Sequence, residues 1–134
     1  MTDNNITLNH EQMRALDLML QGRNVSISGK GGTGKSELIK IYAERCALNI
    51  ALLAPTGLAA KNIGGRTING FFGFPGCISD MPLLPTIQDE KRVAMIEGTD
   101  VIIIDEASML RSDMLTRLCL ELRALAPEHL SYQP

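Results

Sequence analysis

Apolar residues follow two different patterns along this chain. Two unbroken apolar runs, residues 50–54 and 101–104, have the length of strands. The second consists of four β-branched residues, which is typical of a strand buried on both faces of a parallel sheet. A shorter β-branched segment at residues 24–28 predicts a third strand. The segments between these runs have helical spacing, so the sequence predicts a three-layer α/β fold, with helices on both faces of a parallel sheet. With only three strands, this sheet is incomplete.

The first expected helix has a well-marked start and end. Asn9 is a good N-cap, Gln12 stands three residues later as in a capping box, and Gly22 ends the helix. Apolar faces and breakers place the other helices at residues 35–48, 58–63, 67–72, 88–97 and 112–125. Prolines and glycines predict an irregular loop over residues 73–86.

Composition indicates an ordinary globular chain. It has 134 residues, 45% of them hydrophobic and 21% charged, enough for one modest domain. The net charge of −2 excludes a broad basic footprint, so any contact with DNA is expected in a local groove. No apolar run is long enough to cross a membrane, and the N-terminus lacks the features of a signal peptide. Three widely spaced cysteines indicate neither a zinc site nor a disulfide framework, which fits a reducing cytoplasm, or the nucleus in a eukaryote.

Residues 29–36 fit the phosphate-loop pattern G-x-x-x-x-G-K-[ST], between a predicted strand and a predicted helix. Glycines give the backbone freedom to turn successive N–H groups toward a polyphosphate, and the following helix directs its positive end at the same anion. Lys35 is expected to reach the β- and γ-phosphates of ATP, and the Ser36 hydroxyl to ligate Mg²⁺. The loop itself supplies the other expected nucleotide contacts: Gly29, Gly31, Gly32, Thr33 and Gly34. A glycine-rich turn without a ligand is the alternative, and the flanking elements argue against it.

Two carboxylates follow the last apolar run. Asp105 and Glu106 stand at the carboxyl end of a predicted central strand, where ligands bind in open α/β sheets. Asp105 is expected to hold the water shell of Mg²⁺, and Glu106 to take a proton from the attacking water, with Lys35 as its catalytic partner. The alternative is that the acidic pair only ends the strand and caps the next helix. Beside a phosphate loop, the pair favours ATP hydrolysis.

Four segments with these motifs resemble one family over nearly the whole chain: residues 8–12, 29–36, 54–60 with 64–68, and 103–109. The chain resembles the N-terminal part of the petite-integration-frequency helicases. These are RecD-like, superfamily-one motors that hydrolyse ATP and move 5′→3′ on single-stranded DNA. The resemblance implies a RecA-like fold, ATP and Mg²⁺ as cofactors, and single-stranded DNA as partner. The segment formed by residues 54–60 with 64–68 separates this family from other ATPases with a phosphate loop.

The resemblance also implies roles for particular residues. Gln12 is expected to recognise the adenine, with the capping box as an alternative that can hold at the same time. Contacts with the DNA backbone are expected from five residues: Thr56, Gly57, Lys61, Thr67 and Asn69. For Lys61 the alternative is a solvated helix face. Phe71 and Phe72 are candidates for stacking on a base, although core packing is the favoured interpretation.

The sequence departs from the family pattern in three respects. Asn69 stands where the family usually has histidine, and Lys30-Gly31 where it more often has a small polar residue and alanine. The chain also ends soon after Asp105, before the family's arginine finger and second RecA-like domain. Its last three arginines, Arg111, Arg117 and Arg123, are all expected on the helix after Asp105, and none on a second domain across the nucleotide. Residues 1–134 are therefore expected to form a partial RecA-like domain of a fragment or a truncated relative.

Two other classes of protein compete with a helicase part. One is a nucleotide-binding module with little or no turnover, because the chain supplies no arginine across the nucleotide. The other is a phosphate-loop kinase or helicase loader, which the Ala54-Pro55-Thr56-Gly57 segment disfavours.

Overall fold

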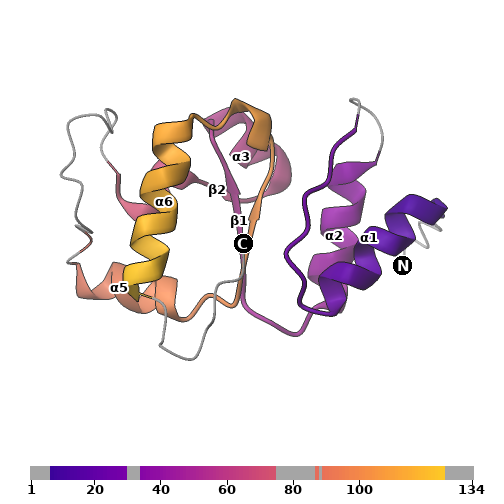
Figure 1. The fold of residues 1–134 in the computed structure, drawn as a ribbon, viewed down its shortest axis with the longest axis horizontal. Coiled ribbons are helices and arrows are strands. Elements are labelled where there is room, and N and C mark those ends of the chain that lie inside the picture. The colour runs from indigo at the N-terminus through magenta and orange to yellow at the C-terminus, as the bar shows by residue number, and fades with distance from the viewer. Residues whose placement is uncertain (1–6, 30–33, 75–86, 88, 126–134) are drawn as a thin grey trace. The chain divides into compact units, whose positions relative to one another are not determined.

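The computed structural model describes residues 7–29, 34–74, 87 and 89–125 (Figure 1). The chain divides into two compact units, residues 1–47 and a second unit that begins at Leu48. No helix in the described part is long and apolar enough to cross a membrane.

The first unit is a pair of helices, α1 (His10–Leu20) and α2 (Lys35–Arg45). Both halves of the predicted capping box are present at the start of α1. The two helices pack on each other through buried apolar residues: Leu16, Leu38, Ile39 and Tyr42. The apolar face of α1 is narrower than its pattern suggests, because Met13 is 55% exposed. Helix α2 ends at Arg45, before the predicted residue 48, since Cys46 has extended backbone angles.

The predicted strand at residues 24–28 is wrong. These residues carry no secondary structure, and only Val25 among them is half-buried. An extended segment becomes a strand only when a neighbouring strand pairs with its backbone. The described residues of the first unit offer no such neighbour.

The second unit contains a parallel three-stranded sheet in the order β2-β1-β3. Its strands are β1 (Ile50–Ala54), β2 (Arg66–Thr67) and β3 (Val101–Ile104). The α/β fold with a parallel sheet is confirmed, with β2 in place of the strand expected at 24–28. β2 has two residues, too few for any apolar period to reveal it.

Helix α3 (Gly57–Ile63) connects β1 with β2, and α4 (Ile68–Phe72) and α5 (Glu90–Glu97) lie between β2 and β3. Helix α6 (Ser112–Leu125) follows β3, with a short 3₁₀ helix (Ala107–Met109) before it. The prediction for α6 is confirmed at both ends. Much of the predicted loop 73–86, residues 75–86, lies outside the described residues, as does residue 88.

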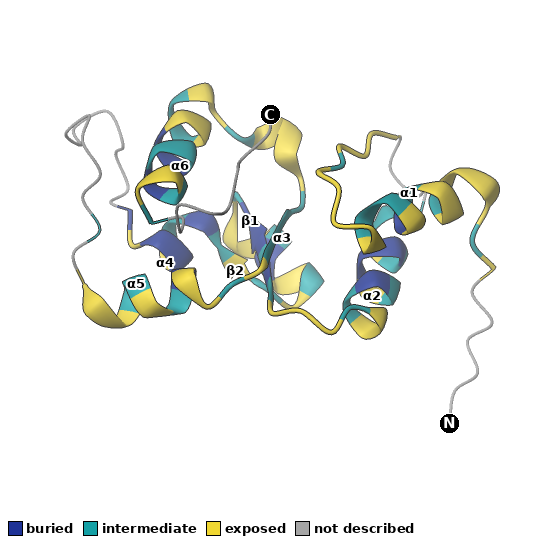
Figure 2. Cartoon of the chain, turned by 60° about the horizontal axis from the view of Figure 1, so that its bottom comes forward, coloured by how far each residue is buried: buried dark blue, intermediate teal, exposed yellow. Residues whose placement is uncertain are grey.

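The core of the second unit lies on one face of the sheet (Figure 2). Ala51 and Leu53 of β1 point into it, together with residues from α4, α5 and α6: Ile68, Phe71, Phe72, Ile96 and Leu118. The prediction that residues 101–104 are buried on both faces is wrong, because all four are half-buried. β3 is an edge strand in the described sheet, and it pairs only with β1.

Candidate nucleotide- and DNA-binding site

The end of the phosphate loop turns directly into helix α2. Gly34 is the N-cap residue with φ 79°, a left-handed conformation that glycine adopts without strain. Lys35 is the first helical residue, and its Nζ donates to the carbonyl oxygen of Gly29 at 2.5 Å. This bond joins the two ends of the loop. Ser36 is exposed in the first turn of α2. Gly31, Gly32 and Thr33 lie outside the described residues.

Gln12 lies against the end of this loop. A Cβ atom added at Gly34 would stand 2.4 Å from Gln12 Nε2. The same side chain takes part in the capping box, because its Oε1 accepts from the Asn9 backbone N–H at 2.8 Å. The Asn9 side chain in turn accepts from the Gln12 backbone N–H at 2.9 Å. The cap therefore holds the Gln12 amide beside the loop, so a capping role and a nucleotide-binding role are compatible.

Asp105 and Glu106 follow β3 as predicted. The Asp105 backbone N–H continues the ladder by donating to the carbonyl oxygen of Leu53 at 2.9 Å, and its side chain is half-buried. Glu106 is exposed and has φ 55°, the one left-handed residue other than glycine in the described part. That conformation costs about 1–2 kcal/mol in a residue with a Cβ.

The capping alternative for this acidic pair is wrong. Glu106 stands at the N-cap position of the 3₁₀ helix, yet its side chain caps nothing. Neither carboxylate is hydrogen-bonded or paired with a cation in the described residues. Both carboxylates remain available to a ligand. Lys35 and Ser36 belong to the first unit, and these carboxylates belong to the second.

The residues expected to contact DNA gather at one edge of the sheet. Thr56 and Thr67 follow or end the parallel neighbours β1 and β2, whose register pairs Ala54 with Thr67. Each threonine caps the next helix: Thr56 Oγ1 accepts from the Ala59 N–H at 3.2 Å, and Thr67 Oγ1 from the Gly70 N–H at 3.0 Å. A hydroxyl that accepts in this way can still donate its own hydrogen.

The other three expected DNA contacts lie on the helices that these threonines cap. Gly57 and Lys61 are exposed on α3, and Asn69 is half-buried on α4. Base stacking by Phe71 and Phe72 is contradicted, because the two side chains are 4% and 0% exposed and belong to the core.

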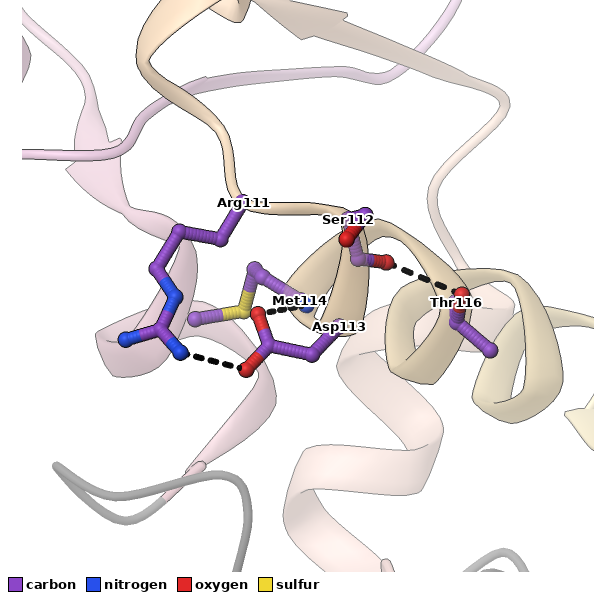
Figure 3. A network of polar contacts seen from close by, with 5 residues as sticks. All are labelled: Arg111, Ser112, Asp113, Met114 and Thr116. Carbon is purple, nitrogen blue, oxygen red and sulfur yellow. Dashed lines mark hydrogen bonds and ion pairs between the residues drawn. The ribbon is translucent and has the colours of Figure 1, made fainter.

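Arginines near the end of the described chain are already engaged. Figure 3 shows Arg111 paired with Asp113 at 2.9 Å, while the other Asp113 oxygen accepts from the Met114 N–H. Arg117 lies 3.6 Å from Glu121, and both side chains are buried. This buried ion pair was not predicted. Its only signal in the sequence is a spacing of four residues, which exposed pairs share.

A parallel α/β sheet with a phosphate loop before a helix and an acidic pair after a strand defines a phosphate-loop NTPase of the RecA-like kind. The model of the PIF1-like helicase family matches residues 7–132. The chain belongs to that family.

Curated relatives agree. The chain is 37% identical over 114 residues to the ATP-dependent DNA helicase Pif1 of Bdellovibrio bacteriovorus, covering 82% of this chain and 26% of the relative. It is 35% identical over 134 residues to the ATP-dependent DNA helicase PIF1 of Saccharomyces cerevisiae, covering 92% of this chain and 15% of the relative. The chain thus spans about a quarter or less of the length of these relatives.

Solved structures give the same result. Bacteroides Pif1 in complex with ADP-AlF4 superposes with a TM-score of 0.80 at 34% identity, over 90% of this chain and 28% of that one. Bacteroides Pif1 bound to single-stranded DNA gives a TM-score of 0.79 at 36% identity, with the same coverage. The expected resemblance and the RecA-like fold are confirmed.

Proposed function

We propose that this chain forms the ATP-binding half of the first RecA-like domain of a 5′→3′ DNA helicase. The observation that carries the proposal is the construction of the loop end. Gly34, Lys35 and the Gln12 side chain come together at the start of α2, in a chain whose family members include ATP-dependent DNA helicases. Solved relatives bound to ADP-AlF4 and to single-stranded DNA support the two ligand classes.

The nucleotide contacts divide by chemistry. Lys35 neutralises phosphate charge, and in doing so exchanges its bond to the Gly29 carbonyl for one to a phosphate oxygen. The backbone N–H groups of residues 29–34, among them Gly31, Gly32 and Thr33, bind the phosphates. Gln12, fixed by the capping box, meets the purine edge through its amide.

Ser36 and Asp105 are the proposed ligands of Mg²⁺, on the chemistry of their oxygen donors. The Ser36 hydroxyl is exposed, and the Asp105 carboxylate has no protein partner in the described residues. Oxygen donors of this kind suit a hard cation that keeps several waters. When held by these residues, Mg²⁺ would supply positive charge that offsets the phosphate charge of ATP.

Glu106 is the proposed general base. Its carboxylate is exposed, unpaired in the described residues and displayed by a left-handed turn after β3. It accepts a proton from the attacking water, which leaves Asp105 to the metal. A strained backbone at a candidate catalytic residue supports this role.

Single-stranded DNA is proposed to pass the edge where β1 and β2 end. Thr56 and Thr67 donate their hydroxyl hydrogens to phosphates, Gly57 and Asn69 add polar contacts, and Lys61 adds charge. Since the contacts are few and are made with the phosphates of the DNA backbone, DNA binding should be weak, steeply dependent on salt and independent of base sequence.

ATP binding is tested by titrating a fluorescent ATP analogue into variants. Lys35→Ala should remove most binding, whereas Glu106→Gln should largely retain it, because only Lys35 meets ground-state phosphate charge. Lys40→Ala is the matched control, since Lys40 is exposed on the same helix and, among the described residues, pairs only with Glu37. Equal losses in Lys35→Ala and Glu106→Gln would refute the division of roles.

DNA binding is tested by fluorescence anisotropy with a labelled oligonucleotide at low salt. Lys61→Ala combined with Thr67→Ala should weaken binding several-fold, and Lys40→Ala should not. If the wild type binds no oligonucleotide, or the double variant binds as the wild type does, the proposed strand path is wrong.

A nucleotide-binding module with little turnover is the second candidate function, and the engaged arginines favour it. Arg111 and Arg117 are held in ion pairs, and an arginine at the γ-phosphate is worth about 10³–10⁵ in rate in related NTPases. We expect the 134-residue polypeptide, expressed by itself, to hydrolyse ATP very slowly and to unwind no duplex. A steady-state ATPase assay with and without single-stranded DNA measures the rate of hydrolysis, and a strand-displacement assay measures unwinding. DNA-stimulated turnover of several per second would refute this expectation.

We further propose that the protein works in a reducing compartment that holds DNA, the cytoplasm or a nucleus. Both described cysteines are free, which supports such a compartment. A fluorescent fusion found only in a secretory compartment would contradict this.

A further inference from the structure

Two arginines meet at one end of helix α4. Arg92, on α5, donates from one guanidinium nitrogen to the carbonyl oxygens of Gly70 and Phe71, at 2.8 and 2.9 Å. Arg66, on β2, donates to the same Gly70 oxygen at 3.4 Å and to the Met95 sulfur at 3.1 Å. The Arg66 guanidinium carbon also lies 5.8 Å from the centroid of the Phe71 ring. Two like charges therefore share a single acceptor.

No carboxylate offsets this charge in the part of the chain that the structure describes. The ion pairs found there join other residues: Lys40 with Glu37, Arg111 with Asp113, and Arg117 with Glu121. Two carbonyls, a thioether sulfur and an aromatic ring hold Arg66 and Arg92 in place without neutralising them.

Capping of α4 explains Arg92 but not Arg66. Arg92 satisfies two carbonyls at the C-terminal end of the helix, as a basic side chain does in many helices. Arg66 adds a long bond to an oxygen that already has a donor, and a bond to sulfur, which is a weak acceptor. Arg66 is exposed, and a guanidinium carries five N–H donors in a planar fork that matches phosphate oxygens.

We propose that Arg66 and Arg92 bind one phosphate of the DNA backbone, in addition to the contacts at Thr56 and Thr67. This rests on the proposed function, which supplies DNA as the anion. Arg66 directly precedes Thr67, and α4 is five residues long, about 7.5 Å, so the site continues the proposed strand path along α4. In a chain with a net charge of −2, attraction to a polyanion has to come from such local clusters.

The test compares Arg66→Gln with Arg14→Gln. Glutamine retains polar donors and much of the stem but removes the charge, and Arg14 is an exposed arginine of α1 far from this site in sequence, which matches the change in net charge. Anisotropy of labelled single-stranded and duplex oligonucleotides is measured over a range of salt concentrations. The plot of log K against log salt concentration has a negative slope. Arg66→Gln should make that slope less negative by about 0.7 for single strands or about 0.9 for duplex. The form of DNA with the larger loss identifies the source of the phosphate.

Two further measurements separate binding from folding. Arg66→Lys should keep the slope, because it keeps the charge, while affinity falls through loss of the fork. The side-chain Nε–Hε NMR signals of Arg66 and Arg92 should shift during titration with inorganic phosphate, whereas that of Arg14 should not.

The outcomes are distinct. If the wild type binds DNA and Arg66→Gln has the slope of Arg14→Gln, this site is wrong and the proposed function stands. Absence of the phosphate-induced shifts likewise overturns the site. If the wild type binds no DNA at any salt concentration, the proposed function fails, and the ligand assigned to this site fails with it.

Discussion

Gly34 joins the phosphate loop to the Gln12 amide, so replacing it by alanine tests both features at once. Its φ of 79° is strained for any residue with a Cβ, at about 1–2 kcal/mol. The new Cβ would also stand 2.4 Å from Gln12 Nε2, which is the far end of a flexible side chain and can move. Moving it breaks the bond from the Asn9 N–H, a net loss of about 0.5–1.5 kcal/mol.

The unfolded state offsets part of this destabilisation. Alanine restricts the unfolded chain more than glycine does, which returns about 0.4–1 kcal/mol. Gly34→Ala should therefore lower the free energy of unfolding by about 1–2.5 kcal/mol. It should also weaken binding of a fluorescent ATP analogue, because both the loop end and the Gln12 amide are displaced.

Gly22→Ala is the matched control. Gly22 has φ 77°, yet a Cβ there would meet nothing within 4 Å, so this variant carries the backbone strain alone. Urea denaturation measures each variant in the wild type and in a Gln12→Ala background. The Gly34→Ala loss should shrink by about 1 kcal/mol when Gln12 is already absent, while the Gly22→Ala loss should not change. Contact between Gln12 and the loop end at Gly34 is contradicted if the two glycine variants lose the same stability in both backgrounds and both bind the ATP analogue as the wild type does.

Gly65→Ala should destabilise the second unit by about 1–3 kcal/mol, because its Cβ would lie 2.2 Å from the Leu52 carbonyl oxygen; in urea denaturation Gly57→Ala, with nothing within 4 Å, is the control. Burial, followed by a hydrogen bond with Cys46, raises the pKa of Tyr42 to about 12. The stability that the neutral Tyr42 side chain contributes is therefore fully present below pH 10 and is lost as the pH rises to about 12. Thermal melts should show this loss of stability in the wild type and not in Tyr42→Phe. Thr67→Asp should keep the cap of α4 and leave the melting temperature of the protein unchanged, but its carboxylate should repel DNA phosphates. Unchanged DNA affinity in that variant would contradict the contact between Thr67 and DNA.

Elements with a strong local signal could be predicted from the sequence. The run at residues 50–54 has the length of a strand and is bounded by Pro55, and the strand appears with those bounds. Helix α6 combines an apolar period with the Pro127 breaker, and its bounds also agree. The capping box of α1 is a signal within four residues, so it did not depend on the rest of the fold.

The errors arise where distant residues decide the outcome. A β-branched segment such as residues 24–28 favours extended backbone, but a pairing strand makes it part of a sheet, and none pairs with it in the described first unit. The burial of residues 101–104 depends on how many strands flank β3. The meeting of Arg66 with Arg92 joins residues 26 positions apart through the end of α4, and no short pattern encodes it.

Several residues that we propose to bind ligands also cap helices, and this coincidence has a physical cause. Where a strand ends and a helix begins, the first helical N–H groups need acceptors, and Thr56 and Thr67 provide them. The same N–H groups and hydroxyls are what a phosphate binds, so one residue type serves both needs. Loss of ligand binding in an alanine variant at such a position therefore does not by itself establish contact. A substitution that keeps the cap and changes only the charge, such as Thr67→Asp, separates the two roles.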